Sequence, residues 1–197
     1  MPRAYGYPCP DCRTTNNLHD TGCRFKGHPW HDVEKAYVGV LSTLAAGSRA
    51  EEALRRDVPG DWDALHAACL DQLREEYRVE ESAGRLRVVG PAERKEHLSV
   101  PPEDPLHTIY ERGSVPGCHD NAVFALVSWY ESVGFSWAET REQVIEWLHD
   151  SGTWERGGFE ESSPEALLRS KRHVYERGYG WRQRAEAAKR VIESAGP

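Results

Sequence analysis

The spacing of apolar residues predicts a mainly helical protein. From Asp32 onward they recur every three or four positions, as on the buried face of a helix, with Asp32 placed to cap its start and Gly47 to end it. A short helix is expected over residues 49–56, and after a turn at 58–60 Asp61 is placed to cap a third. The apolar faces of the first and third helices consist of Val33, Tyr37, Val40, Leu41, Leu44 and of Trp62, Leu65, Ala68, Cys69, Leu70, Leu73.

Strand-like alternation follows the third helix. In residues 77–80 and 85–89, on either side of a turn, apolar and polar residues alternate. This pattern predicts a β-hairpin. Four prolines and many charges then mark 91–105 as a linker. Beyond it, we expect helices over 121–133, from Ser136 or Ala138 to about His149, over 164–177 with Ser163 as the cap, and over 181–194.

These elements place the chain in the α+β class, mainly α, with four parts. Residues 1–31 would form a metal-binding knuckle, 32–90 the three helices and hairpin, 91–105 the linker and 106–197 a helical C-terminal domain. The first part is rich in cysteine, proline and glycine and poor in aliphatic residues, so it cannot bury a core unaided. Structural zinc can supply the folding free energy of such a segment.

Three cysteines in this part have the spacing of a metal site. Cys9 and Cys12 form a Cys-x2-Cys knuckle, and Cys23 supplies a third thiolate. For the fourth ligand we favour His19, because a His-x3-Cys pair brings both ligands together over one turn. His28 is the close alternative and His31 the third. Three thiolates and one imidazole would close a tetrahedral structural Zn²⁺ site, with a zinc-finger rather than a catalytic role.

Other uses of these cysteines are less well matched. An iron–sulfur cluster usually takes four cysteines, and Cys69 and Cys118 are distant in sequence. An odd total of five does not suit a disulfide framework. The remaining alternative is that the three are free surface thiols.

The order of three helices and a hairpin resembles a winged helix-turn-helix, which lays its third helix in the DNA major groove. Here that helix carries more acids than bases and would repel phosphates. The basic pairs are instead Arg55 with Arg56 and Arg85 with Arg87. This favours a protein-interaction module or spacer, with direct DNA contact as the alternative. The acids of the third helix are Asp61, Asp63, Asp71, Glu75 and Glu76.

Overall charge and composition limit the partners, the source and the cellular location that we expect. A formal net charge of −7 argues against a bulk DNA coater, so nucleic-acid binding would need a local basic face. Arginine-dominated basic residues and a single methionine are typical of a GC-rich, salt-adapted source such as a halophilic archaeon. No stretch approaches the roughly 18–20 apolar residues of a membrane span, and the first residues lack the apolar core of a secretory signal. We therefore expect a cytoplasmic protein without a membrane partner.

The segment from Gly113 to Asn121 places turn-forming and polar residues immediately before an apolar helix. His119 and Asn121 beside the amide-rich start of that helix are suited to hold a phosphate or carboxylate. The alternative is an ordinary capping turn in which Asp120 or Asn121 satisfies the first amides.

This region resembles the helical C-terminal domain of archaeal, phage and plasmid replicative primases, which has Gly-x-Arg-Asn-Asn before an apolar helix. Gly117 and Asn121 match the outer positions, whereas His119 and Asp120 depart from the pattern. The resemblance covers about 80 residues and implies a helical accessory module working near DNA replication or a mobile element. Its other matches are Glu146–Trp147 and Ser163–Pro164–Glu165.

A later run interleaves basic and aromatic residues, the composition that stacks on bases while following phosphates. Its helical spacing also fits ordinary core packing, which is the alternative. The candidate nucleic-acid contacts are Lys171, Arg172, His173, Tyr179, Trp181, Arg182, His119 and Asn121.

The leading functional hypothesis is a non-enzymatic, zinc-binding protein associated with DNA or RNA, in transcription control or replication. A zinc-stabilised adaptor for protein partners is the alternative from another class. A third is a hydrolase or transferase using His119 with Cys118, Asp120 or Glu160, although neighbours on a turn need not meet.

Overall fold

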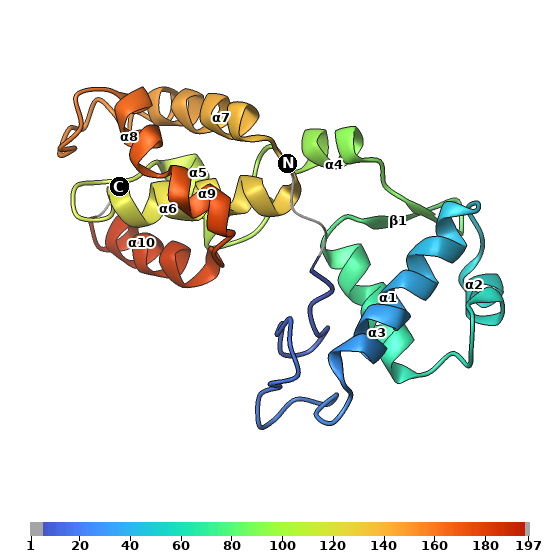
Figure 1. Ribbon diagram of the computed structural model, residues 1–197. Helices are drawn as coiled ribbons and strands as arrows, with labels where there is room; N and C mark the ends of the chain where they lie inside the picture. The colour runs from blue at the N-terminus through green and yellow to red at the C-terminus, as the bar shows by residue number, and fades with distance from the viewer. Residues whose placement is uncertain (1–5, 196–197) are drawn as a thin grey trace. The chain divides into compact units, whose positions relative to one another are not determined.

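The computed structural model describes residues 6–195 and divides between Arg94 and Lys95 into two compact units, here called the N-terminal and C-terminal units (Figure 1). The described residues are mainly helical with one two-stranded hairpin, which confirms the expected fold class. None of the helices in this described part has the length and apolar character needed to cross a membrane.

The N-terminal unit has its helices and hairpin in the expected order. It consists of α1 (Trp30–Ala45), α2 (Glu51–Asp57), α3 (Ala64–Glu75), β1 (Val79–Ser82) and β2 (Arg85–Val88). Helix α1 packs against α3 and β2, and its fully buried Tyr37 and Val40 lie in the core of the unit. The burial of this apolar face is what holds the helices together.

Two expected helix caps are wrong. Helix α1 begins at Trp30, so Asp32 lies within its first turn, where it stabilises the positive end of the helix dipole instead of capping it. Helix α3 is capped by Asp63 rather than Asp61, because the Asp63 side chain accepts a hydrogen bond from the backbone amide of His66.

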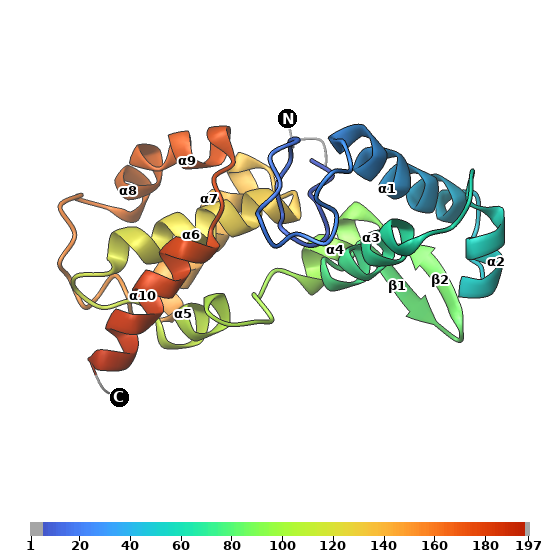
Figure 2. The same cartoon turned by 90° about the horizontal axis from the view of Figure 1, so that it is seen from below.

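The hairpin pairs Val79 with Val88 and Ser82 with Arg85 in antiparallel register, and both strands are visible in Figure 2. Ala83 and Gly84 at its tip have φ values of 50° and 71°, the left-handed pair that a tight two-residue hairpin turn requires. Arg49, between α1 and α2, forms an antiparallel bridge with Leu86. This bridge ties the hairpin to the helical part of the unit.

Residues 91–105, expected to be a linker, contain regular structure. Helix α4 (Pro91–His97) begins at a proline, which suits a first helical position because it has no amide hydrogen to satisfy. Arg94 and Leu98 are buried, at 7% and 4% exposure. The prolines of this segment therefore lie within folded structure and do not mark an unstructured linker.

In the C-terminal unit, α6 (His119–Val133) lies between α7 (Trp137–Asp150) and α10 (Arg182–Ser194) (Figure 1). Helix α5 (Leu106–Arg112) packs against α6 and α10. Ser136 caps α7 in a reciprocal pair of hydrogen bonds with Glu139, which selects Ser136 over Ala138 as the start.

The helix expected over 164–177 is broken at Lys171 into α8 (Pro164–Ser170) and α9 (Arg172–Arg177). The break lets the two apolar faces meet different partners. Leu167 and Leu168 on α8 are buried on the side that packs against α7, whereas Val174 on α9 is buried where α9 meets α6. One straight helix would expose part of this apolar surface.

Candidate metal centre and basic surface

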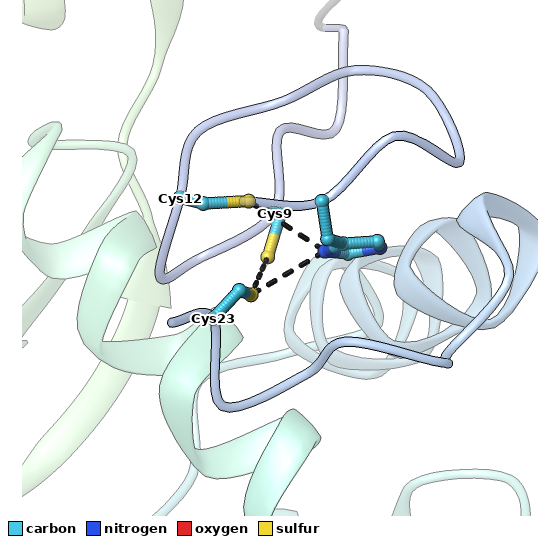
Figure 3. Close-up of side chains that lie close together, drawn as sticks. Cys9, Cys12 and Cys23 are labelled. Atoms are coloured by element: carbon cyan, nitrogen blue, oxygen red, sulfur yellow. Dashed lines mark hydrogen bonds between the residues drawn. The ribbon is translucent and has the colours of Figure 1, made fainter. Parts of the chain in front are cut away.

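Four side chains predicted as metal ligands converge in the N-terminal unit. The ligand atoms of Cys9, Cys12, His19 and Cys23 all lie within 4.8 Å of one another. The Cys9 and Cys23 sulfurs are 3.6 Å apart, too far for a disulfide, and Figure 3 shows the three thiols turned toward a common point. Nδ1 of His19 lies 3.6 Å from the Cys12 sulfur and 3.4 Å from that of Cys23.

These spacings fit a bound ion. With Zn–S bonds of about 2.3 Å and Zn–N bonds of about 2.0 Å, the edges of a tetrahedral site are about 3.5–3.8 Å long. The separations of 3.4–3.6 Å between sulfur and nitrogen or sulfur atoms are close to these edges. The four residues can therefore hold a metal ion without large rearrangement of the backbone.

Backbone hydrogen bonds build the two turns that carry the thiols. The Cys9 amide donates to the carbonyl of Thr14 and the Arg13 amide to the carbonyl of Cys9, with Arg13 in the left-handed region at φ 63°. In the second turn, the Phe25 amide donates to the Cys23 sulfur at 3.4 Å. An amide directed at a thiolate stabilises its negative charge and orients the ligand.

The ring of His19 is oriented by His28. Nε2 of His19 lies 3.0 Å from the backbone carbonyl oxygen of His28, an acceptor only, so Nε2 carries the hydrogen. Nδ1 is then left with a lone pair directed at the sulfurs, which is how metal-binding histidines are commonly held. His28 contributes its carbonyl and not its ring, and exposed His31 pairs with Asp32, so His19 is the histidine of the cluster.

Burial and hydrogen bonding affect the thiols differently. Burial raises the pKa of Cys23 to about 12, with further raising from hydrogen bonds with Cys9 and Cys12. Burial also acts to raise the pKa of Cys12, but hydrogen bonds from the backbone amides of Thr14 and Asp20 outweigh it and lower the pKa to about 7. The site thus already contains amide donors that favour thiolate.

The cysteine-bearing segment is part of the core of the N-terminal unit. Cys9, Cys23 and Phe25 are at most 8% exposed and belong to the same apolar cluster as the buried faces of α1 and α3. The Tyr7 ring lies 5.9 Å from that of Tyr37. The cysteine–histidine cluster and the three helices therefore share one core.

The C-terminal unit carries two neighbouring hollows on its surface. One of about 640 Å³ is lined by predicted contacts His173, Tyr179 and Arg182, and one of about 290 Å³ by predicted contact Asn121. The hollows share Gln183 and Arg184. Their remaining lining residues are Phe124, Gly180, Ala187 and Arg190.

Arg184 is held in place where the two hollows meet. Its guanidinium lies 5.1 Å from the centre of the Phe124 ring and donates a hydrogen bond of 2.8 Å to the Asn121 side-chain oxygen. The Phe124 and Tyr179 rings are 5.6 Å apart and tilted by 37°. Four of the eight predicted contacts thus lie together with Arg184 of α10 and Phe124 of α6. They are Asn121, His173, Tyr179 and Arg182.

The other predicted contacts are engaged elsewhere. Trp181 is half-buried against Trp129, with ring centres 5.6 Å apart. Lys171 pairs with Asp120 at the start of α6, and Arg172 pairs with Glu176 one turn along α9. None of these three lines the hollows.

A protein-family model matches residues 3–195, which covers nearly the whole chain and spans both units. The chain belongs to DUF7474, a family of unknown function. No curated protein and no solved structure matches the chain. The resemblances to primase C-terminal domains and to winged helices therefore stay predictions.

In this DUF7474 protein, His119 is buried at 6% exposure and does not reach the hollows. Its Nδ1 lies 2.6 Å from the hydroxyl of fully buried Ser114 and its Nε2 2.9 Å from the carbonyl of Gly157. The ring stacks on Phe159 at 4.2 Å. Burial lowers its pKa, so the neutral imidazole links two chain segments.

Cys118 does not pair with His119. Its thiol is directed at the carbonyl of Val115, 3.3 Å away, and burial raises its pKa. A nucleophile needs its base within hydrogen-bond reach and access to substrate. Ser114 and His119 are within hydrogen-bond distance, but the Ser114 hydroxyl is buried and a substrate could not reach it. The pair therefore connects parts of the fold.

Sequence reasoning missed Phe124, Arg184 and Arg190 of the DUF7474 chain. Gln183, Ala187 and Arg190 recur at helical spacing, a signal that α10 directs them to one side. The sequence does not distinguish Phe124 from a core residue, because its position fits the apolar face of α6. It is half-buried, and part of its ring lines the larger hollow.

Proposed function

We propose that this protein is a non-enzymatic, zinc-stabilised nucleic-acid-binding protein. Zinc is the ion that best suits three thiolates and one imidazole at tetrahedral spacing, because soft sulfur ligands select against Mg²⁺ and Ca²⁺. All four positions are taken by protein ligands, so the ion has a structural role. Its work is to hold the first turns of the chain against α1 and α3.

The observation that carries the nucleic-acid proposal is the gathering of arginines around aromatic rings in the C-terminal unit. Arg182, Arg184 and Arg190 line the hollows, and none of them forms an ion pair with any residue in the described range 6–195. In a chain of net charge −7, three arginines without acidic partners on one surface form a local basic face.

The basic side chains of the N-terminal unit are less suited to phosphate. Arg55 pairs with Glu51, and Arg56 pairs with Asp57. On the hairpin, Arg87 pairs with Glu80 and Glu93. Their charge is compensated within the protein, and the acidic surface of α3 adds repulsion. Nucleic acid is therefore assigned to the C-terminal unit rather than to α3.

The test is a fluorescence-anisotropy titration of the full, zinc-loaded chain with labelled DNA and RNA at low and high salt. We expect binding that weakens as salt rises, because phosphate contacts release counterions. Native mass spectrometry on the same sample should find one zinc ion per chain. Absence of binding to every probe at low salt would overturn the nucleic-acid proposal and favour the protein-adaptor alternative.

A further inference from the structure

The two hollows adjoin along α10, and together they are here called the track. Gln183 and Arg184 line both, so the larger hollow neighbours the smaller one. From Arg182 to Arg190 the helix rises about 12 Å, at 1.5 Å per residue. A stacked strand of nucleic acid advances about 3.4 Å per nucleotide, so the track matches three to four nucleotides.

The larger hollow offers ring surface to a ligand. Phe124 and Tyr179 both line it, and Tyr179 is 39% exposed although it is a large aromatic residue. Gly180 follows Tyr179 without a side chain to cover its ring. The flat faces of nucleobases are available for such stacking only when the strand is not in a duplex, where each base is already stacked on its neighbours.

Arg184 lies over the Phe124 ring, 5.1 Å from its centre, whereas the exposed Tyr179 ring has its own place in the hollow. Arg184 is held by Phe124 and by Asn121, which limits the rotamer freedom that it would lose on binding. Arg190 lies six residues further along α10, about 9 Å away along the helix axis, in the smaller hollow. Along the helix axis, this spacing between the two positions corresponds to about three nucleotides of a stacked strand.

We infer that this track binds single-stranded nucleic acid, with a base stacking on Tyr179 beside Phe124 and phosphates meeting Arg184 and Arg190. The inference rests on the proposed function and specifies its ligand. Duplex would meet the same arginines but could not use the rings. The preference for a single strand is therefore the property that identifies the site.

The experiment compares a labelled oligothymidylate and oligouridylate of about ten nucleotides with a labelled duplex of equal length. We expect the single strands to bind at least tenfold more tightly than the duplex. Tyr179→Ala should weaken single-strand binding about tenfold, since one base stack is worth that much, whereas Tyr179→Phe should keep it. Circular dichroism checks that each variant is folded.

Two variants with the same change in net charge distinguish binding through contacts in the track from binding through the overall charge of the protein. Arg190→Glu should weaken binding at least tenfold and lower the salt dependence. Arg169→Glu makes the same change in net charge on α8, outside both hollows, and should have little effect. Equal losses in the two variants would overturn the inference.

The outcomes distinguish this inference from the proposed function. No binding of any nucleic acid would remove both. Duplex binding equal to or tighter than that of the single strands, or binding unaffected by Tyr179→Ala, would overturn the single-strand track and leave the broader proposal standing. Polyglutamate that displaces the strand as well as unlabelled oligothymidylate would also overturn it, since the surface would then recognise acidic chains in general.

Discussion

Nε2 of His19 lies 3.0 Å from the carbonyl oxygen of His28, so one histidine faces the thiols and the other fixes its ring through the main chain. This relationship separates two residues that sequence spacing alone left in competition. In the proposed zinc site only the ring of His19 would serve as a ligand, and the His28 ring can be changed while its carbonyl remains.

His19→Ala should therefore lose zinc, whereas His28→Ala should keep one ion per chain. The physical reason is that alanine at position 28 retains the backbone acceptor. Metal analysis of the two purified variants, with their thermal unfolding curves, makes the comparison. Zinc loss in the His28 variant with retention in the His19 variant would reverse the ligand assignment.

Removal of zinc should unfold more than the cysteine-bearing turns. Structural zinc contributes about 10–16 kcal/mol in small zinc peptides, comparable to the whole stability of a domain, which is about 5–15 kcal/mol. Because Cys9 and Cys23 are buried in one core with Tyr37, amides of α1 and α3 should lose protection from hydrogen exchange. Amides of α6 should keep theirs. Unchanged protection in α1 after chelation would contradict the shared core.

His119 should stabilise the C-terminal unit through its two ring nitrogens. His119→Ala leaves the Ser114 hydroxyl and the Gly157 carbonyl without their partner, at a cost of about 3 kcal/mol in unfolding free energy. The exposed His173→Ala should change stability by less than about 0.5 kcal/mol. Urea unfolding followed by circular dichroism makes the measurement, and equal effects would argue against the network.

The same histidine should make stability fall in mild acid. Burial lowers its pKa in the folded state below the ordinary value of 6.5, so the unfolded chain takes up the proton first as pH drops. The contribution is complete above pH 6.5 and is lost as pH falls from there through the folded pKa. The difference in stability between the parent and His119→Ala should shrink over this window. A constant difference would show that His119 does not titrate in this way.

Glu139 should add a second acid-sensitive contribution at lower pH. The Lys95 ammonium and the Ser136 amide lower its pKa from 4.5 to about 2. Stability from this group is complete above pH 4.5 and is lost as pH falls toward 2. Glu139→Gln should flatten the acid profile in that window. Glu142→Gln on the same helix is the control. An equal flattening in that variant would show that the effect comes from losing one negative charge and not from the contacts of Glu139.

The sequence predicted the gathering of the four candidate ligands well because its information is local. Cys9, Cys12, His19 and Cys23 lie within fifteen residues, and the chemistry of thiolates limits what they can do together. Helix periodicity was likewise enough to find α1, α3, α6 and α10. In each case the signal is carried by neighbours in the chain.

Properties that depend on distant contacts were not predicted. The break at Lys171 arises because α8 and α9 pack on different helices, which periodicity within 164–177 does not encode. The sequence predicts a surface contact at His119 because the partners that bury it, Gly157 and Phe159, come about forty residues later. Arg184 is held in the candidate site by Phe124 and Asn121, about sixty residues earlier.

The shared core of the N-terminal unit limits how the protein can be divided for study. A fragment beginning at Trp30 would keep every residue of α1 yet leave Tyr37 and Val33 without the cover of Cys9, Cys23 and Phe25. Such a fragment would expose apolar surface and tend to aggregate. Expression designs should cut after the hairpin and keep the cysteine-bearing residues attached to the helices that they complete.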